Sequence, residues 1–537
     1  MREINISDLL SNNKIDKVKS EIINLYLSDE RPWVVGFSGG KDSTTVVQLV
    51  LESLKSLEKS QLSKKIYVIS SNTLVETPPV IKRILDSHKF INEISSKYDL
   101  PIETKIVHPL SEQTFWVNII GRGYPSPNQT FRWCTDRMKI DPANRFITDA
   151  VSEHGEVIVL LGVRKDESSS RERNIREHEH VGKVLMKHST LSNAYVYSPI
   201  KDFSIDDVWD FLLSSNNEFK DNNYELYKIY AESNSNECPL IIDKNTKESA
   251  GSCGNSRFGC WTCTVVDQDK SLTGFIEKGH TWLIPMLEFR NWLAEIRDQR
   301  DFRMKKRTNG KIYFSPIIRL EDKFIIPKKS KRDKLEIKNY KGKWIDSENN
   351  EWMVFESENL AKKYINDKNL NLQSKNDPRI ISRINNSDWG QLGLGPFTLE
   401  ARKEILYRLL KTQKKLSVDF DLISKNELNE IRIIWRSEGI LDDPISKIYY
   451  EIFGEELSQS SKVKRLSNDQ ILRLKKLSKK YVVSFELLKK LLGNEINNLG
   501  LSSRKKIIST IKRELTSDYL NLSENGTDYE DQKNYNM

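Results

Sequence analysis

The feature that most constrains the fold is a strand, a glycine turn and a helix in immediate succession near the amino terminus. An apolar run over 33–37 has the character of a buried parallel strand, and the apolar segment 45–51 has helical character. The intervening turn contains Gly39 and Gly40, which permit a positive φ and close approach of the backbone to a ligand. Such a unit aims free backbone N–H groups at an anion, so the sequence predicts a phosphate-binding turn over 38–44.

The residues of this turn distinguish between two kinds of phosphate loop. The Walker A pattern G-x-x-x-x-G-K-[ST] fails, because Lys41 is followed by Asp42. The run Ser-Gly-Gly-Lys-Asp-Ser-Thr instead resembles the PP-loop of the ATP pyrophosphatases. That resemblance implies a grip on the β,γ-pyrophosphate of ATP that leaves the α-phosphorus open to attack. It implies that Lys41 adds charge and that Asp42 organises the loop or Mg²⁺ rather than acting as a base. The implied pyrophosphate ligands are Ser38, Gly39, Gly40, Ser43 and Thr44.

The rest of the amino-terminal half alternates between strand-like and helix-like segments. Apolar strands are predicted over 65–73, 103–108 and 156–162, and helices over 15–29, 78–99 and 140–153. This alternation predicts an α/β domain with a doubly wound parallel sheet over residues 1–235, whereas 109–130 has the character of a loop. Ligands bind at the carboxyl edge of such sheets, where the second strand ends in Asn72, a candidate nucleotide contact.

A second motif follows the predicted strand 156–162. Gly162-x-Arg164-x-x-Glu167-Ser168-x-x-Arg171 resembles a signature of the phosphoadenosine phosphosulfate (PAPS) reductase branch of PP-loop proteins. The resemblance implies that Gly162 and Glu167 belong to the nucleotide site and that Arg164 and Arg171 face a polyanionic substrate. A solvated charged loop is the alternative, but its position after a strand at the ligand edge favours a functional role.

These motifs, the cysteine pattern and the length together resemble the DndC family of DNA phosphorothioation proteins of bacterial dnd systems, with motifs over about 30–290. The resemblance implies an enzyme that converts ATP to AMP and pyrophosphate by adenylating a DNA backbone phosphate for sulfur incorporation. It implies DNA, a cysteine desulfurase as sulfur donor and other dnd-type proteins as partners. The alternatives are a PAPS or adenylyl-sulfate reductase-like enzyme, a tRNA-thiolation-like PP-loop enzyme and a non-enzymatic DNA-binding subunit.

Four of the five cysteines cluster in a glycine- and serine-rich stretch, which favours a metal site over disulfides. Four thiolates can hold tetrahedral Zn²⁺ or a [4Fe-4S] cluster. Zinc sites usually contain two short Cys-x2–4-Cys hooks, and only one is present here, so the spacing favours iron–sulfur, as does the resemblance to DndC. The expected ligands are Cys238, Cys253, Cys260 and Cys263.

The fifth cysteine, Cys134, stands apart in the sequence, between Arg132 and Arg137 and just before a predicted helix. The arginines and the helix are expected to lower its pKa and favour the thiolate. Three roles remain open: a buried structural thiol, a cluster ligand in place of Cys238, or a sulfur-carrying thiol. We expect the last, with Cys134 as a catalytic residue and Cys238 as the fourth ligand.

The remaining sequence is charged and has little recognisable chemistry. The net charge of +9 permits contact with nucleic acid, and basic clusters over 300–307, 328–334 and 462–480 are candidate phosphate contacts or ordinary solvated faces. The chain has neither an apolar run of eighteen residues nor a signal-peptide pattern, so we expect a cytoplasmic protein without a membrane partner. From about residue 295 the chain is expected to be mainly helical. The expected divisions after residue 235 are a cysteine-rich segment (236–295), a basic mixed region (296–395), a helical domain (396–515) and a disordered tail (516–537).

Overall fold

The computed structural model describes most of the chain in separate stretches. They are residues 6–167, 184–188, 190–214, 218–232, 259–307, 393–416, 420–457, 466–498 and 505–515, and the backbone of several short strands between 314 and 392. All structural statements below concern these residues.

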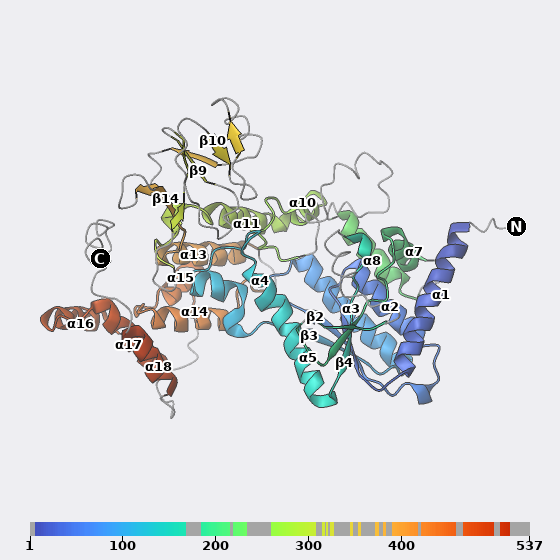
Figure 1. Ribbon diagram of the computed structural model, residues 1–537. Helices are drawn as coiled ribbons and strands as arrows, with labels where there is room; N and C mark the ends of the chain where they lie inside the picture. The colour runs from blue at the N-terminus through green and yellow to red at the C-terminus, as the bar shows by residue number, and fades with distance from the viewer. Residues whose placement is uncertain are drawn as a thin grey trace.

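A six-stranded sheet forms the centre of the amino-terminal half (Figure 1). Its strands, in spatial order, are β3 (Ile102–Val107), β2 (Ile66–Ser71), β1 (Trp33–Gly36), β4 (Val157–Leu160), β6 (Ala194–Tyr197) and β5 (Met186–Lys187). All neighbouring strands are parallel except β5 and β6, which are antiparallel. The prediction of a doubly wound, mostly parallel sheet is confirmed, although β5 and β6 were not predicted.

Helices cover both faces of this sheet. They are α1 (Ile6–Leu27), α2 (Lys41–Leu54), α3 (Pro78–Lys97), α5 (Asp141–His154), α7 (Ile205–Leu213) and α8 (Lys220–Glu232). Alternate residues of a strand point to opposite faces. Thus Trp33 and Val35 lie in a core with α1, α2 and α7, whereas Val34 lies in a smaller core with Ile147 of α5.

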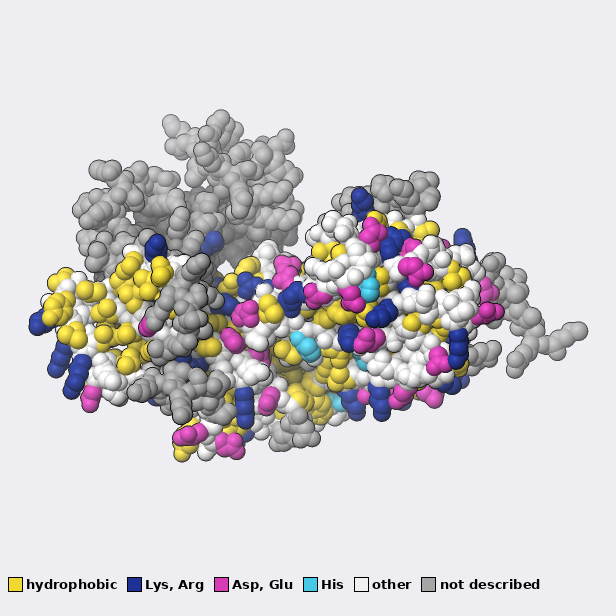
Figure 2. Space-filling view, turned by 90° about the horizontal axis from the view of Figure 1, so that it is seen from below, with side chains coloured by type: hydrophobic (Ala, Val, Ile, Leu, Met, Phe, Trp, Pro, Cys, Tyr) yellow, Lys and Arg dark blue, Asp and Glu magenta, His cyan; other side chains and the backbone are white. Residues whose placement is uncertain are grey.

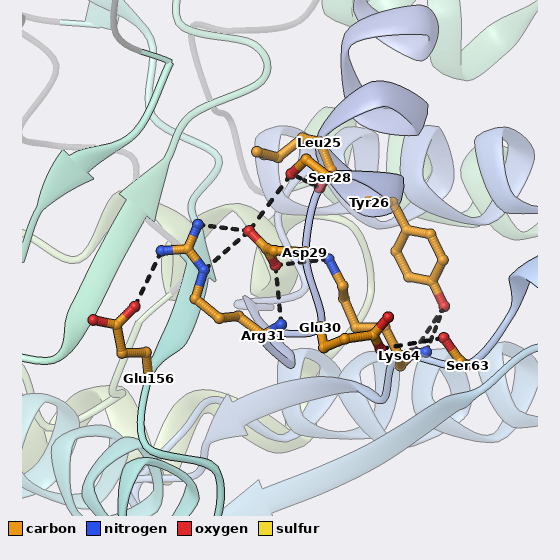
Figure 3. Close-up of polar contacts among 9 residues, drawn as sticks. All are labelled: Leu25, Tyr26, Ser28, Asp29, Glu30, Arg31, Ser63, Lys64 and Glu156. Carbon is orange, nitrogen blue, oxygen red and sulfur yellow. Dashed lines mark hydrogen bonds and ion pairs between the residues drawn. The ribbon is translucent and has the colours of Figure 1, made fainter.

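An ionic network closes the amino-terminal edge of the sheet (Figure 3). Asp29, just before β1, accepts from Nη2 of Arg31 at 2.6 Å and from Nζ of Lys64 at 3.1 Å. Arg31 also reaches Glu156, just before β4, at 3.3 Å. The hydroxyl of Tyr26 donates to the carbonyl of Lys64 at 2.9 Å, and burial raises the pKa of Tyr26 to about 12. The network connects α1 to the beginnings of β1, β2 and β4. It lies at the edge of the sheet opposite the carboxyl ends of these strands, where ligands bind in such sheets.

A second, larger core lies beside the sheet domain and combines segments from distant parts of the chain. Residues 115–138 pack in it with Trp261 and with five helices: α10 (Lys270–Glu277), α11 (Ile284–Ile296), α13 (Leu399–Leu416), α14 (Lys425–Ser437) and α15 (Pro444–Phe453). Nε1 of Trp116 donates to the carbonyl of Leu422 at 2.7 Å, and Nε1 of Trp435 donates to that of Ile120 at 2.8 Å.

One sequence prediction about this part of the chain is therefore wrong. Residues 109–130 are not simply a loop, because they contain a short 3-10 helix (Ser111–Gln113) and a buried π-helix (Val117–Gly121). Beyond residue 295 the described stretches are mainly helical, as predicted, but they also contain short strands. These strands are β7 (Phe314–Pro316), β8 (Ile318–Leu320), β9 (Lys323–Ile326), β10 (Trp344–Asp346), β11 (Met353–Phe355), β12 (Asn371–Ser374), β13 (Ile380–Ser382) and β14 (Trp389–Leu392), and every pair among them is antiparallel.

The helical character predicted beyond residue 396 is found in α13 to α15 and in three further helices: α16 (Asn468–Lys480), α17 (Phe485–Asn497) and α18 (Lys505–Leu515). The expected tail over 516–537 lies outside the described residues. Within the described stretches, no helix combines the length and the apolar character that a membrane crossing requires.

Candidate active site

The predicted phosphate loop is a tight turn between β1 and α2. Gly39 has φ 75°, and a Cβ there would lie 2.8 Å from Cγ1 of Ile84, so only glycine fits well. Gly40 is the N-cap of α2, which leaves the first N–H groups of the helix without acceptors inside it. Phe37 donates its N–H to the carbonyl of Ile69 at 2.8 Å, which fixes the turn against the end of β2. The loop therefore presents a helix N-terminus at the carboxyl edge of the sheet, an arrangement that binds anions.

Three hydroxyl groups line this loop. The hydroxyls of Ser38 and Ser43 lie 3.2 Å apart, and Ser43 donates to the carbonyl of Gly40 at 3.0 Å. The buried Oγ1 of Thr44 forms no hydrogen bond within the described part of the chain. Buried hydroxyls normally have a partner, so Thr44 is suited to a bound ligand.

Two buried cations share the carboxylate of Asp42. Nε of Arg164 lies 2.6 Å from Oδ1, and Nζ of Lys41 lies 3.2 Å from Oδ2. Both cationic side chains are only 2% exposed. Nη1 of Arg164 is buried without a hydrogen bond among the described residues, and its ion pair with exposed Asp166 is long, at 3.7 Å. Asp42 therefore organises the loop, and the buried, unbonded Nη1 of Arg164 favours an anion beside it within the described part of the chain.

Gly162 brings the end of β4 against the first turn of α2. A Cβ at Gly162 would lie 2.8 Å from the carbonyl carbon of Asp42 and 2.9 Å from the nitrogen of Ser43. The absence of a side chain thus lets the following Arg164 reach Asp42. In the structure this glycine acts through close packing of two backbones.

The other predicted nucleotide contacts lie at the same edge or outside the described residues. Asn72 follows β2, and its Oδ1 accepts from the N–H of Leu74 at 2.8 Å, so it shapes the turn there. Glu167 ends a 3-10 turn (Lys165–Glu167) next to Arg164, and its side chain is outside the described part. Arg171 is outside it as well.

The Cys-x-x-Cys hook is paired with the segment that follows β2. Glu76 and Cys260 form an antiparallel bridge, and Trp261 donates its N–H to the carbonyl of Val75 at 3.0 Å. The hydroxyl of Thr73 lies 3.2 Å from Sγ of Cys260. The N–H of Cys263 donates to the carbonyl of Cys260 at 3.0 Å, which closes the hook as a turn. The hook therefore lies at the same sheet edge as the phosphate loop.

Cys134 is brought to this hook from the other side. It belongs to a short helical turn (Trp133–Thr135), and the carbonyl of Lys139 accepts from the hydroxyl of Ser71 at the end of β2, at 3.2 Å. Cys263 contributes to a raised pKa of the Cys134 thiol, so the two sulfur atoms lie near each other. The pKa of Lys139 is raised mainly by Cys260, and Glu76, Cys134 and Cys263 add to this effect. The ammonium group of Lys139 therefore lies near three thiols and one carboxylate.

The sequence-based expectation for the pKa of Cys134 is wrong. Burial raises this pKa above its usual value, and the neighbouring Cys263 raises it further, against a smaller opposing effect of Lys139. Arg137, expected to lower it, instead donates to Asn118 and to the hydroxyl of Tyr124. Burial and the Glu76 carboxylate likewise raise the pKa of Cys260. The free thiols of Cys134 and Cys260 are therefore protonated at neutral pH, and a bound metal would displace their protons.

The described thiols suit a thiolate-ligated cluster but do not complete one. No group of three Cys, His, Asp or Glu side chains is in metal-holding geometry in the described stretches, and Cys238 and Cys253 lie outside them. Cys134 on one segment and Cys260 and Cys263 on another still supply the thiol donors that iron–sulfur clusters and Zn²⁺ use. On this observation, Cys134 joins Cys260 and Cys263 as a candidate ligand.

Several residues of the site were not predicted. Arg290 of α11 is 1% exposed and donates to the carbonyls of Cys263 and Asp267 at 2.9 and 2.8 Å. These two hydrogen bonds fix the backbone at the end of the hook to α11. Tyr230 of α8 contacts the phosphate loop through its hydroxyl, 3.2 Å from the backbone nitrogen of Lys41. Neither has a local sequence signal, because both contacts join residues that are distant in the chain.

The predicted DNA-contacting basic clusters differ in exposure. Arg303 is buried, and its Nε donates to the carbonyl of Gly395 at 2.6 Å, so this arginine is structural. Burial lowers its pKa to about 10. The basic residues of α16 are exposed: Arg473, Lys475, Lys476, Lys479 and Lys480. Figure 2 shows Lys and Arg interspersed with Asp and Glu over the sheet domain, without one continuous basic face in that view.

Comparison with known proteins gives a match to the part of the chain that carries the loop. Residues 32–266 match the phosphoadenosine phosphosulfate reductase domain family. An uncharacterized protein of Methanocaldococcus jannaschii is 28% identical over 194 residues, which are 36% of this chain and 33% of that protein. The chain therefore spans about a third of the length of this curated relative.

Three solved structures are similar to part of this chain. Candida glabrata FMN adenylyltransferase with FMN and an ATP analog is 18% identical, over 40% of this chain and 60% of that one, with a TM-score of 0.26. Candida auris phosphoadenylyl-sulfate reductase in a phosphate complex is 14% identical, over 41% and 93%, with a TM-score of 0.24. The U34-tRNA thiolase NcsA of Methanococcus maripaludis with its [4Fe-4S] cluster is 15% identical, over 41% and 73%, with a TM-score of 0.24.

Proposed function

We propose that this chain, whose residues 32–266 form a PAPS reductase-type domain, cleaves ATP to AMP and pyrophosphate by adenylating a phosphate oxygen of the DNA backbone, which sulfur then replaces. The observation that carries the ATP step is the loop itself. Its helix N-terminus, its serine hydroxyls and the Thr44 hydroxyl, which has no hydrogen-bond partner among the described residues, lie at one edge beside the buried cations Lys41 and Arg164. Positive charge and N–H donors of this kind stabilise the pyrophosphate leaving group.

The reaction balances in two displacements. A non-bridging oxygen of the DNA phosphate attacks the α-phosphorus of ATP, the bond to the β-phosphate oxygen breaks, and pyrophosphate leaves. A hydrosulfide or persulfide sulfur then attacks the DNA phosphorus, and AMP leaves with the former DNA oxygen. With a persulfide, a second thiol must reduce the remaining S–S bond; a cysteine desulfurase is the proposed source of the sulfur.

The thiol site supports the sulfur step of the proposal by its position at the same edge as the loop. Cys134, Cys260 and Cys263 would hold a [4Fe-4S] cluster together with Cys238 or Cys253. A bound cluster would supply a site for a sulfide ion or an electron. Lys139 places one positive charge among these thiols and so lowers the cost of gathering negative charge there.

The proposal is tested by the products from ATP. We expect the anaerobically purified protein to release AMP and pyrophosphate, faster with DNA present, and not ADP. Ser38→Ala should reduce pyrophosphate release at least about tenfold, since it removes a donor to the leaving group. Ser152→Ala is the matched control, because Ser152 lies on the distant helix α5, where it bonds its own backbone. ADP as the main product would contradict the proposal, and stimulation by tRNA instead of DNA would redirect it to tRNA thiolation.

A second candidate is favoured by the family match itself. A PAPS reductase-type domain can bind an adenylyl sulfate that is already made, in which case ATP is not cleaved. Sulfite release from adenylyl sulfate or PAPS in the presence of a dithiol reductant, without pyrophosphate release from ATP, would establish this alternative. The two activities are measured on the same preparation, so the outcomes are directly comparable.

A further inference from the structure

Tyr230 touches the phosphate loop at a backbone group that an anion would use. Its hydroxyl lies 3.2 Å from the backbone nitrogen of Lys41, which donates to it. A Cβ on Gly40 would lie 3.2 Å from the same hydroxyl and 3.6 Å from Oγ of Ser38. Tyr230 therefore occupies space that is open because residue 40 has no side chain.

The chemistry of this contact resembles that of a bound phosphate. Lys41 is the first residue of α2, so its N–H has no acceptor within the helix. An anion at a helix N-terminus accepts from such N–H groups. The oxygen of Tyr230 accepts from this N–H in the place of a phosphate oxygen, and both cannot occupy the same position.

We propose that the hydroxyl of Tyr230 holds the place of a phosphate oxygen on Lys41 and is displaced when the pyrophosphate part of the nucleotide binds. Tyr230 thereby sets the affinity of the loop for its ligand. The inference rests on the proposed function in one respect only, that the loop binds pyrophosphate.

The surroundings of Tyr230 explain why it holds this position firmly. Its side chain is 5% exposed, and its ring packs perpendicular to that of Trp209, with the centroids 5.2 Å apart. Nζ of Lys41 lies 5.4 Å from the centre of the Tyr230 ring, within the range of a cation–π contact. Displacement of the hydroxyl therefore disturbs packing, and the ligand must compensate for that loss.

The test compares inorganic pyrophosphate binding by the full-length protein and its Tyr230→Phe variant, using calorimetry. The variant lacks the acceptor for the Lys41 N–H, so a phosphate oxygen meets no competitor there. We expect about five- to hundredfold tighter binding by the variant. Its melting temperature without ligand should be lower, and pyrophosphate should raise it by more than in the wild type.

Tyr227→Phe is the matched control. Tyr227 lies one turn earlier on α8 and also packs edge-on against Trp209, at 5.7 Å. Its hydroxyl can be removed without changing the Tyr230 contact, so wild-type pyrophosphate affinity is expected. The same change in both variants would show a general loosening of α8 and would overturn the inference.

Each of the remaining outcomes of the pyrophosphate-binding test either supports or overturns the inference. Unchanged affinity of Tyr230→Phe, or no pyrophosphate binding by either protein, overturns the inference. Weaker binding overturns it too, because it would show that the hydroxyl donates to phosphate. Since pyrophosphate binding requires neither DNA nor catalysis, tighter binding by the variant together with a lack of ATP cleavage would leave the inference standing while the proposed function fails.

Discussion

The charged side chains at the phosphate loop are buried and pair with one another. Lys41 and Arg164 both pair with the carboxylate of Asp42, and both cations are 2% exposed. A buried ion pair contributes little net stability, but removal of one partner leaves uncompensated charge. Lys41, Asp42 and Arg164 therefore have a structural role in addition to any contact with a nucleotide.

Replacement of Asp42 tests this structural role. Asp42→Asn should lower the free energy of unfolding by about 3 kcal/mol, because two buried cations lose their counter-charge. Asp166→Asn is the control, since the Asp166 side chain is 65% exposed and lies 3.7 Å from Arg164. We expect less than about 0.5 kcal/mol from that change. Urea unfolding measures both, and equal effects would contradict the account of Asp42.

The position of Cys134 makes a second residue-level prediction. The segment of Cys134 is held at the end of β2 by the Ser71 hydroxyl, and Cys263 contributes to the raised pKa of Cys134, so we expect Cys134 to be a cluster ligand. After anaerobic purification, Cys134→Ser should lose most of its iron, as should Cys260→Ser. Iron and labile sulfide analysis decides the matter. Full iron in Cys134→Ser, with loss in Cys238→Ser, would return Cys134 to the role of a separate sulfur-handling thiol.

At the scale of elements, local patterns predicted local structure well. The strand–turn–helix unit at 33–54 was recognisable because apolar runs, glycines and hydroxyl residues adjoin in the sequence. The bridge between Glu76 and Cys260 was not, because no local pattern specifies which distant segments pair. The helix α8 was also not predicted. Its apolar residues are divided between two cores, since Tyr230 lies in the core of the sheet domain and Ile229 packs against the second core.

The ionic network at the amino-terminal edge predicts a dependence of stability on pH. Burial would raise the pKa of Asp29, but hydrogen bonds from Arg31 and Lys64 outweigh it and lower this pKa below its usual value. A lowered carboxyl pKa stabilises the fold above the unfolded-state pKa, and this contribution is lost as pH falls through the folded value.

Asp29→Asn should therefore be less stable than wild type at pH 7 by about 1–2 kcal/mol. The difference should begin to shrink below about pH 4, where the carboxyl of the unfolded chain becomes protonated, and should disappear as the pH falls through the lower pKa of the folded protein. Thermal unfolding of both proteins from pH 7 to pH 3 measures the gap. A gap that stays constant over this range would show that the ionised form of Asp29 does not matter.

At the scale of the whole molecule, the carboxyl-terminal helices pack against the half of the chain that contains the candidate site. Trp435 bonds Ile120 across 315 positions, and α13 to α15 share one core with Trp116, Trp133 and the hook residue Trp261. No sequence pattern indicated this, since apolar periodicity shows that a helix has a buried face but not what covers it. The core that supports the cysteines therefore extends across the divisions expected at 235, 295 and 395.

A chain that ends at residue 395 tests this integration. It lacks the helices that cover residues 115–138, so we expect it to aggregate or to lose cooperative unfolding, and Cys134 should react rapidly with a thiol reagent. The full-length protein should protect Cys134 under the same conditions. A truncated chain with wild-type melting behaviour and a protected Cys134 would show that the sheet domain is independent of these helices.

The central claim, that a DNA phosphate oxygen attacks ATP at the phosphate loop, is tested most directly by following that oxygen. DNA carrying oxygen-18 at its non-bridging phosphate positions is incubated with the protein, ATP and a sulfur source, and the AMP is examined by mass spectrometry. We expect the label in AMP, because AMP leaves the DNA phosphorus with the former DNA oxygen. AMP without oxygen-18 from the DNA, together with uptake of oxygen-18 into AMP from labelled water in a parallel reaction with unlabelled DNA, would contradict the claim, since water would then be the attacking group.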